Sequence, residues 1–171
     1  NMAQQAISKG DMAAAQNYLK QAAQVSKNAS EVNTNLALMA LKGGDVAKAE
    51  TYLAQGSGSN TFKEVMGNLN IAKGNYTQAA SDLAGVNTNS AALAQILAKD
   101  YTSAKSTLAN IKNADAITSY LQAVLAARTD DASTLASSLQ RAVQQDATLA
   151  TRAANDLEFA KYASVIKNIV K

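Results

Sequence analysis

The side chains that could perform chemistry in this chain are its carboxylates, because it contains no histidine and no cysteine. The Ser-His-Asp and Cys-His arrangements of hydrolases and the soft metal ligands are therefore absent. A pair of carboxylates would still be sufficient for glycoside hydrolysis. Most acids, however, stand where helix caps are expected, as do Asp11, Asp45, Asp100, Asp115 and Asp131. We predict that the chain is not an enzyme, and the alternative is an accessory helical domain of a glycan-acting enzyme.

Two short stretches invite comparison with ligand-binding loops. Residues 56–60 (GSGSN) lack both the spacing and the lysine of a phosphate-binding P-loop. The acidic run at 129–133 (TDDAS) is better explained by a helix cap than by a metal loop. We therefore expect neither a cofactor nor a metal.

The composition predicts an all-α fold. Alanine accounts for 37 of the 171 residues, and there is no proline. Alanine, leucine, lysine, glutamine and glutamate are strong helix formers, whereas valine, isoleucine and aromatic residues are too sparse for a sheet-rich fold. The net charge of +3 is spread along the chain. It forms no basic stripe for nucleic acid, and no apolar run is long enough to span a membrane.

A repeated turn signal organises the chain. In five segments an acidic or amide residue, here called the anchor, is followed eight residues later by leucine. The anchors are Asp11, Asp45, Asn75, Asp100 and Asp131. They are 34, 30, 25 and 31 residues apart, which indicates a helical solenoid.

Glycine precedes the first three anchors. Gly10, Gly44 and Gly74 can take the left-handed conformation that ends a helix, and the anchor can then cap the next helix. Each such dipeptide predicts a tight antiparallel helix pair. Lys99 and Asp130 replace the glycine in the last two copies, so we expect less ideal or differently shaped turns there.

Small residues recur where the paired helices should touch. Eight residues before the anchors stand Ala3, Ala37, Gly67, Ala92 and Ala123. Four residues after the first four anchors stand Ala15, Ala49, Ala79 and Ala104. Together with the stretch GDVAKAETYL at 44–53, this pattern resembles the tetratricopeptide repeat, a helix-turn-helix unit of 34 residues. The resemblance implies a right-handed α-α superhelix of about five helix-turn-helix repeats.

The copies are degenerate, because the proline that usually closes each repeat is missing throughout. We predict a repeat array over 1–145, its first repeat truncated at the N-terminus, and capping helices over 146–171. Phe159 and Ile166 belong to an apolar pattern that predicts a capping helix, with a partner-binding amphipathic helix as the alternative. Ser30 and Asp115 are expected to cap helices. The predicted helices span 1–9, 12–27, 31–42, 46–55, 61–73, 76–84, 90–98, 101–112, 116–128, 132–145, 147–154 and 157–170.

In the tetratricopeptide repeat family, the concave face lined by the first helix of each pair commonly binds peptides. The resemblance therefore implies a non-catalytic scaffold that binds a peptide or protein segment on that face. The candidate contacts are Thr34, Leu38, Lys42, Glu64, Asn68, Asn89, Tyr120 and Arg128. Some members clamp a C-terminal carboxylate with Lys, Asn and Arg. The order of these residue types differs here, so that activity is not carried over.

A structural spacer within a larger envelope protein is a further alternative. Abundant Ala, Asn, Gln, Ser and Thr without cysteine resembles the repeat regions of bacterial envelope proteins. We accordingly expect a periplasmic or cell-envelope location and a protein or peptide partner. Tyr18, Tyr52, Tyr76 and Tyr101 are expected to pack inside the fold, because they are too scattered for single-stranded nucleic acid.

Overall fold

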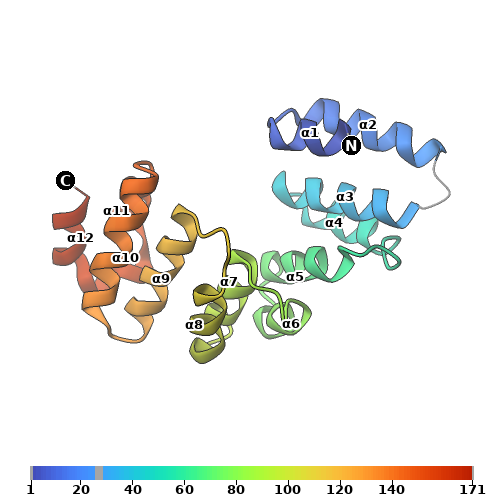
Figure 1. The fold of residues 1–171 in the computed structure, drawn as a ribbon. Helices are drawn as coiled ribbons and strands as arrows, with labels where there is room; N and C mark the ends of the chain where they lie inside the picture. Colours follow the sequence, from blue (N-terminus) through green and yellow to red (C-terminus); the bar gives the residue numbers. More distant parts are fainter. Residues whose placement is uncertain (1, 26–28, 171) are drawn as a thin grey trace. The chain divides into compact units, whose positions relative to one another are not determined.

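The computed structural model describes residues 2–25 and 29–170 (Figure 1). These residues form twelve α-helices and one 3-10 helix. The first six helices are α1 (Met2–Ser8), α2 (Met12–Val25), α3 (Ala29–Lys42), α4 (Val46–Leu53), α5 (Phe62–Ala72) and α6 (Tyr76–Asp82). The others are α7 (Asn89–Leu97), α8 (Tyr101–Ala109), α9 (Ala116–Arg128), α10 (Ala132–Gln145), α11 (Leu149–Asn155), the 3-10 helix η1 (Leu157–Tyr162) and α12 (Ala163–Ile169). The predicted all-α fold is confirmed.

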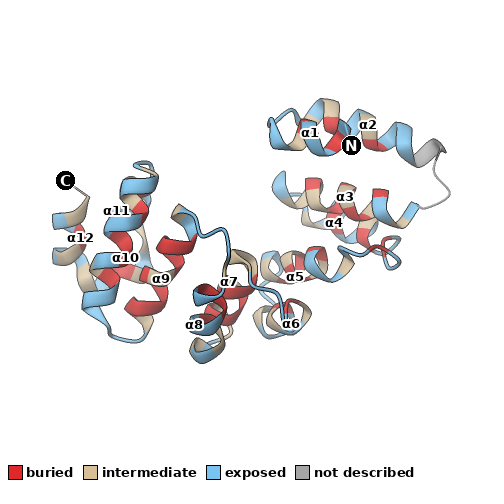
Figure 2. Cartoon of the chain, viewed as in Figure 1, coloured by how far each residue is buried: buried red, intermediate tan, exposed pale blue. Residues whose placement is uncertain are grey.

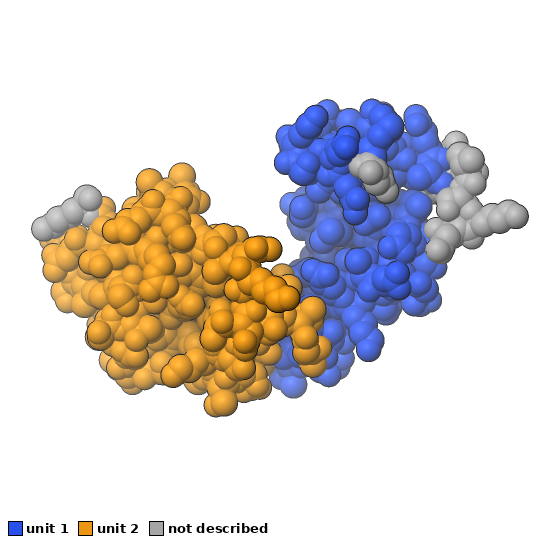
Figure 3. Space-filling view, in the orientation of Figure 1, with its two compact units in different colours: residues 1–83 blue, residues 84–171 orange. Residues whose placement is uncertain are grey.

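The chain forms two compact units, residues 1–83 and residues 84–171 (Figure 3). Consecutive helices pack as hairpins: α1 with α2, α3 with α4 and α5 with α6 in unit 1, and α7 with α8 and α9 with α10 in unit 2. In unit 2, α11, η1 and α12 then pack against α9 and α10. The predicted boundary at residue 145 concerns the repeat pattern rather than these units, and it stays a prediction.

All five hairpin turns share one backbone pattern. In each, the anchor N–H donates to the carbonyl five residues earlier, at 2.8–2.9 Å. The residue before the anchor has a positive φ in every case: 75° at Gly10, 77° at Gly44, 79° at Gly74, 64° at Lys99 and 58° at Asp130. The prediction of differently shaped turns at Lys99 and Asp130 is wrong. The helix pair imposes the left-handed conformation even on a residue with a Cβ, at a cost of roughly 1–2 kcal/mol.

The predicted caps are largely confirmed. The carboxylates of Asp45, Asp100 and Asp131 accept from the backbone N–H three residues on, at 3.0–3.1 Å, and Asp11 does the same. Asp115 forms a reciprocal capping box with Thr118. The exception is the anchor Asn75, whose side chain makes no cap bond and donates instead to the side-chain oxygen of Asn70 at 3.3 Å.

The predicted helix bounds differ from the structure by up to two residues at several ends, and the predicted helix at 101–112 already ends at Ala109. The predicted end of the helix at 12–27 lies outside the described residues. Two further differences have a structural reason. Helix α3 begins at Ala29, so Ser30 lies inside its first turn, where its carbonyl accepts from the Thr34 hydroxyl at 2.9 Å. The predicted single helix at 157–170 is divided into η1 and α12. Asp156 caps η1 through the Glu158 N–H at 3.0 Å, and η1 packs onto α9, which holds this segment in the tighter 3-10 form.

The small residues form the buried contact within each hairpin, as predicted. Ala37, Ala49, Ala79, Ala92, Ala104 and Ala123 are fully buried, and the leucines eight residues after each anchor are buried as well (Figure 2). At Gly67 the third hairpin is tightly packed, because a Cβ there would lie 2.4 Å from Cγ of Leu83. Only glycine fits between α5 and α6 at this point.

The cores of the two units are organised differently. In unit 1 the buried apolar residues form two clusters, one around α2 and α3 and one around α3, α4 and α5, with Tyr52 against both. In unit 2 they form one cluster centred on α9, which also takes in Phe159 and Ile166 from the C-terminal segment. Helix α9 buries nine of its thirteen residues (Figure 2).

Candidate functional site

Four of the predicted contact residues lie on neighbouring helices of unit 1. Leu38 and Lys42 stand on α3, Glu64 and Asn68 stand on α5, and these two helices pack against each other. Lys42 and Glu64 are exposed, whereas Leu38 and Asn68 are half-buried. We call these four residues the A face of unit 1. They combine an apolar side chain with both charges and an amide, which are the groups that a polar peptide segment needs.

Thr34 is not part of this surface. Its side chain is completely buried, and its hydroxyl donates to the carbonyl of Gly56 at 3.3 Å. A Cβ on Gly56 would lie 2.4 Å from the Thr34 hydroxyl oxygen. Thr34 therefore fastens the loop after α4 onto α3, and its predicted role as a partner contact is corrected to an internal one.

Asn89 also makes internal contacts. Its amide nitrogen donates to the Asp115 carboxylate at 3.0 Å, and its oxygen accepts from the Thr118 hydroxyl at 2.9 Å. These bonds join the start of α7 to the start of α9. The Thr118 N–H, followed by the Asn89 amide, holds the pKa of Asp115 below its usual value despite partial desolvation.

Tyr120 and Arg128, both on α9, are covered by the C-terminal segment. The Tyr120 hydroxyl donates to Asp156 at 2.6 Å, and its ring meets Phe159 edge to face at a centroid distance of 5.5 Å. Tyr120 is only 2% exposed, so its predicted place on an open face is wrong. Burial, followed by the bond to Asp156, raises the pKa of Tyr120.

Arg128 pairs with Glu158 through two parallel bonds, one of them 2.8 Å long from Nε to Oε2. Its Nη1 also donates to the carbonyl of Ile96 at 2.9 Å. Bidentate pairs of this kind are among the stronger polar contacts in proteins. Residues 156–159 (DLEF) thus occupy in unit 2 the helix face predicted to bind a partner. No local sequence pattern marks this contact, because its hydrogen bonds join residues 30 and 36 positions apart.

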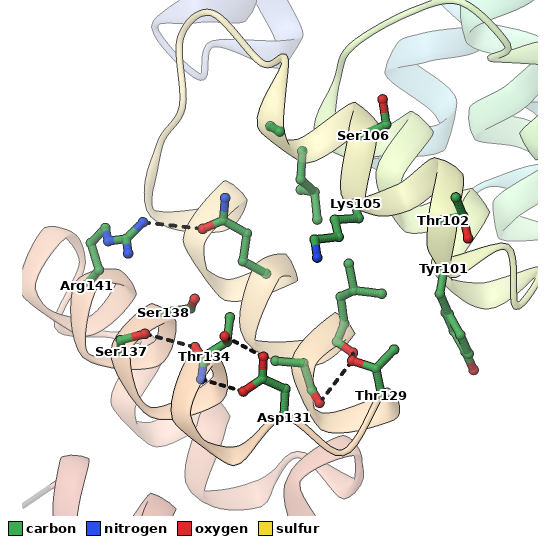
Figure 4. Close-up of a pocket in the computed structure, with 15 residues that line it drawn as sticks. Tyr101, Thr102, Lys105, Ser106, Thr129, Asp131, Thr134, Ser137, Ser138 and Arg141 are labelled. Carbon is green, nitrogen blue, oxygen red and sulfur yellow. Dashed lines mark hydrogen bonds between the residues drawn. The ribbon is translucent and has the colours of Figure 1, made fainter.

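The second helices of the hairpins frame a different feature, a groove in unit 2. Helix α9 forms its floor, α8 and α10 form its walls, and its volume is about 820 Å³ (Figure 4). Sequence reasoning did not find it. In the described part of the chain, no cluster of three or more acidic residues is arranged to hold a metal ion.

Consecutive antiparallel helix pairs with identical turns and small-residue contacts define a helical hairpin-repeat architecture. Residues 6–64 match the model of the tetratricopeptide repeat, which confirms the predicted family resemblance over that segment. Such repeats generally serve as protein–protein interaction scaffolds and are typically non-catalytic. No curated protein and no solved structure matches the chain. Within the described ranges, no helix combines the length and the apolar character needed to cross a membrane.

Proposed function

We propose that this chain is a non-catalytic scaffold that binds a peptide or protein segment on the A face of unit 1. The observation that supports this is the contact between α9 and residues 156–159. There, the same helix face of a hairpin holds a short acidic and aromatic segment through Tyr120 and Arg128. In effect, the chain provides its own example of segment binding on the first helix of a hairpin.

The A face of unit 1 has the groups to do this for a partner. Leu38 offers an apolar contact beside the cation of Lys42, and Asn68 offers an amide that can donate and accept. Glu64 places a carboxylate near the start of α5, where the helix dipole favours it. The partner that fits is a segment with mixed polar and apolar side chains, recognised largely by neutral hydrogen bonds.

The test is selection of binders from a random peptide library, followed by affinity measurement against variants. Peptides that bind the A face should bind the wild type and lose about tenfold or more in affinity for a Leu38→Ala, Lys42→Ala, Asn68→Ala triple variant. They should keep their affinity for Lys112→Ala, an exposed lysine of unit 2. If every selected peptide binds the triple variant as tightly as the wild type, this proposal is wrong.

A further inference from the structure

The groove of unit 2 is lined by the second helices α8 and α10 and by α9, and it contains none of the residues of the proposed A face. Its buried lining is apolar, with Leu125 and Ala126 on the α9 floor and Leu108 at the base of the α8 wall. Its walls are polar, with hydroxyls from Thr102 and Ser106 on α8 and from Thr134 on α10. Figure 4 shows these side chains, with the amino group of Lys105 directed from α8 toward the space between the walls.

The charges of this groove are uneven. Lys105 and Arg141, both exposed, stand on opposite walls, and neither forms an ion pair with a described carboxylate. Arg141 donates only to the Gln122 side chain, at 3.4 Å. The acid of the lining, Asp131, already accepts from the Thr134 N–H at 3.0 Å and from the Thr134 hydroxyl at 2.6 Å. The groove thus presents two cations and one carboxylate already bonded to the start of α10.

Unit 1 contains a smaller counterpart of this groove. It lies between α2 and α4 with α3 as its floor, and its volume is about 400 Å³. Tyr52 lies seven residues after the anchor Asp45, and Ser138 lies seven residues after the anchor Asp131. Both line their grooves. On the opposite wall, Gln16 of unit 1 lies five residues after its anchor, and Lys105 of unit 2 lies five residues after its own. The larger groove is therefore the one with a small residue in place of the tyrosine and a cation in place of the amide.

We propose that the groove between α8 and α10 binds an extended, acidic peptide segment. An extended backbone needs partners for its N–H and C=O groups, and the exposed hydroxyls of Thr102 and Ser106 line the α8 wall of the groove. A helical ligand would leave these hydroxyls unused, because its backbone groups bond to each other. Carboxylates of the segment would meet Lys105 and Arg141, and its apolar side chains would cover Leu125 and Ala126.

The experiment uses the full chain and a random heptapeptide display library, depleted of peptides that bind the Ser138→Tyr variant. That variant copies Tyr52 of unit 1 and fills the groove. The surviving peptides should be enriched in Asp and Glu. Their affinity should fall about tenfold or more in a Lys105→Glu, Arg141→Glu double variant, and it should weaken as salt is raised. A Gln16→Glu variant, the matched change in unit 1, should bind as the wild type does.

The proposal is overturned if no peptide distinguishes the wild type from Ser138→Tyr, or if the selected peptides are neutral or basic. It is also overturned if the selected peptides are helical when bound, as judged by circular dichroism of the complex. Should Ser138→Tyr fail to reach the wild-type thermal midpoint, the charge-reversed variant serves for the depletion. Failure here is distinct from failure of the proposed function, because peptides of the A face respond to the Leu38, Lys42, Asn68 variant instead.

Discussion

In unit 1 the three hairpin turns place glycine in the left-handed conformation, whereas in unit 2 Lys99 and Asp130 take that position. The hydrogen bond from the anchor N–H to the carbonyl five residues earlier is nevertheless the same in both units. The turn geometry therefore follows from the packing of two helices through small residues, and glycine only lowers its cost. In unit 2, burial around α9 sustains a conformation that is unfavourable for the residues that adopt it.

The units also differ in what covers the first helices. Unit 1 leaves Lys42 and Glu64 exposed and divides its core between two clusters. Unit 2 has one cluster, and residues 156–159 are held against α9 as part of it. Residues 156–159 thus cover α9 in unit 2, whereas Lys42 and Glu64, at positions of unit 1 that correspond to Arg128 and Tyr120, are exposed.

The difference in how the first helices are covered is tested most strongly by removing Phe159, which is 1% exposed and packs on Tyr120. Phe159→Ala should lower the free energy of unfolding by about 3–5 kcal/mol, through lost burial and the cavity left on α9. Urea denaturation measures the loss, and hydrogen exchange should show it in α9 but not in α3. The control is Leu157→Ala in the same segment, because Leu157 is 89% exposed and its loss should cost less than about 0.5 kcal/mol.

A second change tests whether close helix approach determines a hairpin. Gly67→Ala should lower the free energy of unfolding by about 1–3 kcal/mol, since the new Cβ would overlap the fully buried Leu83. The reverse change at the matching position, Ala37→Gly, should cost about 1–2 kcal/mol, from the helix penalty of glycine and the loss of one buried methyl group, with no steric overlap. Thermal unfolding of both variants checks this. Equal losses at the two sites would show that α5 and α6 have room to separate.

Exchanging turn residues between the units should have a smaller effect. Lys99→Gly should raise the free energy of unfolding by about 1 kcal/mol by removing the left-handed strain, and Gly44→Lys should lower it by a similar amount. Denaturant unfolding of the two single variants and the double variant measures this. Since the sites are in different units, the effects should add, and a double variant far from the wild type would contradict the comparison.

The smallest expected effect concerns pH. Asp130 accepts from Lys161 and from the Tyr162 hydroxyl, and these bonds hold the pKa of its carboxyl below its usual value. A pKa lowered on folding adds stability above the unfolded-state pKa of about 3.9, and that stability is lost as pH falls through the folded-state pKa. The thermal midpoint of wild type should therefore fall faster below about pH 4 than that of Asp130→Asn.

Lys161→Met provides the control for this pH effect, because it removes the main bond to Asp130 without changing the carboxyl itself. Its pH profile should lie between those of wild type and Asp130→Asn, because the Tyr162 hydroxyl still donates to the carboxyl, and the double variant should match Asp130→Asn. Profiles as steep as the wild type in both single variants would mean that the bond between the α9–α10 turn and η1 contributes nothing.

The sequence was sufficient for the hairpins because their signals are local. A glycine-acid pair, an alanine on each side and a leucine eight residues later lie within two adjacent helices, so Asp45, Ala37 and Leu53 could be placed without coordinates. The candidate site was harder to predict, because the exposure of its residues depends on segments that are distant in the sequence. Tyr120 is covered through contacts made 36 residues away at Asp156, and no local pattern announces that return. The groove of unit 2 was likewise hard to predict, because it depends on Ser138 being small where unit 1 has the larger Tyr52.

The constancy of the five turns has a consequence for how this chain can be altered. With two helices locked through one backbone bond at each anchor, differences in length fall on the helices and on the links that leave each hairpin, such as 54–61 and 110–115. The exposed residues 112–114 of the second link are the place to insert a tag or to splice in another hairpin, since exposed connections tolerate added chain. An insertion between Gly44 and Asp45 would instead separate the two halves of one building block.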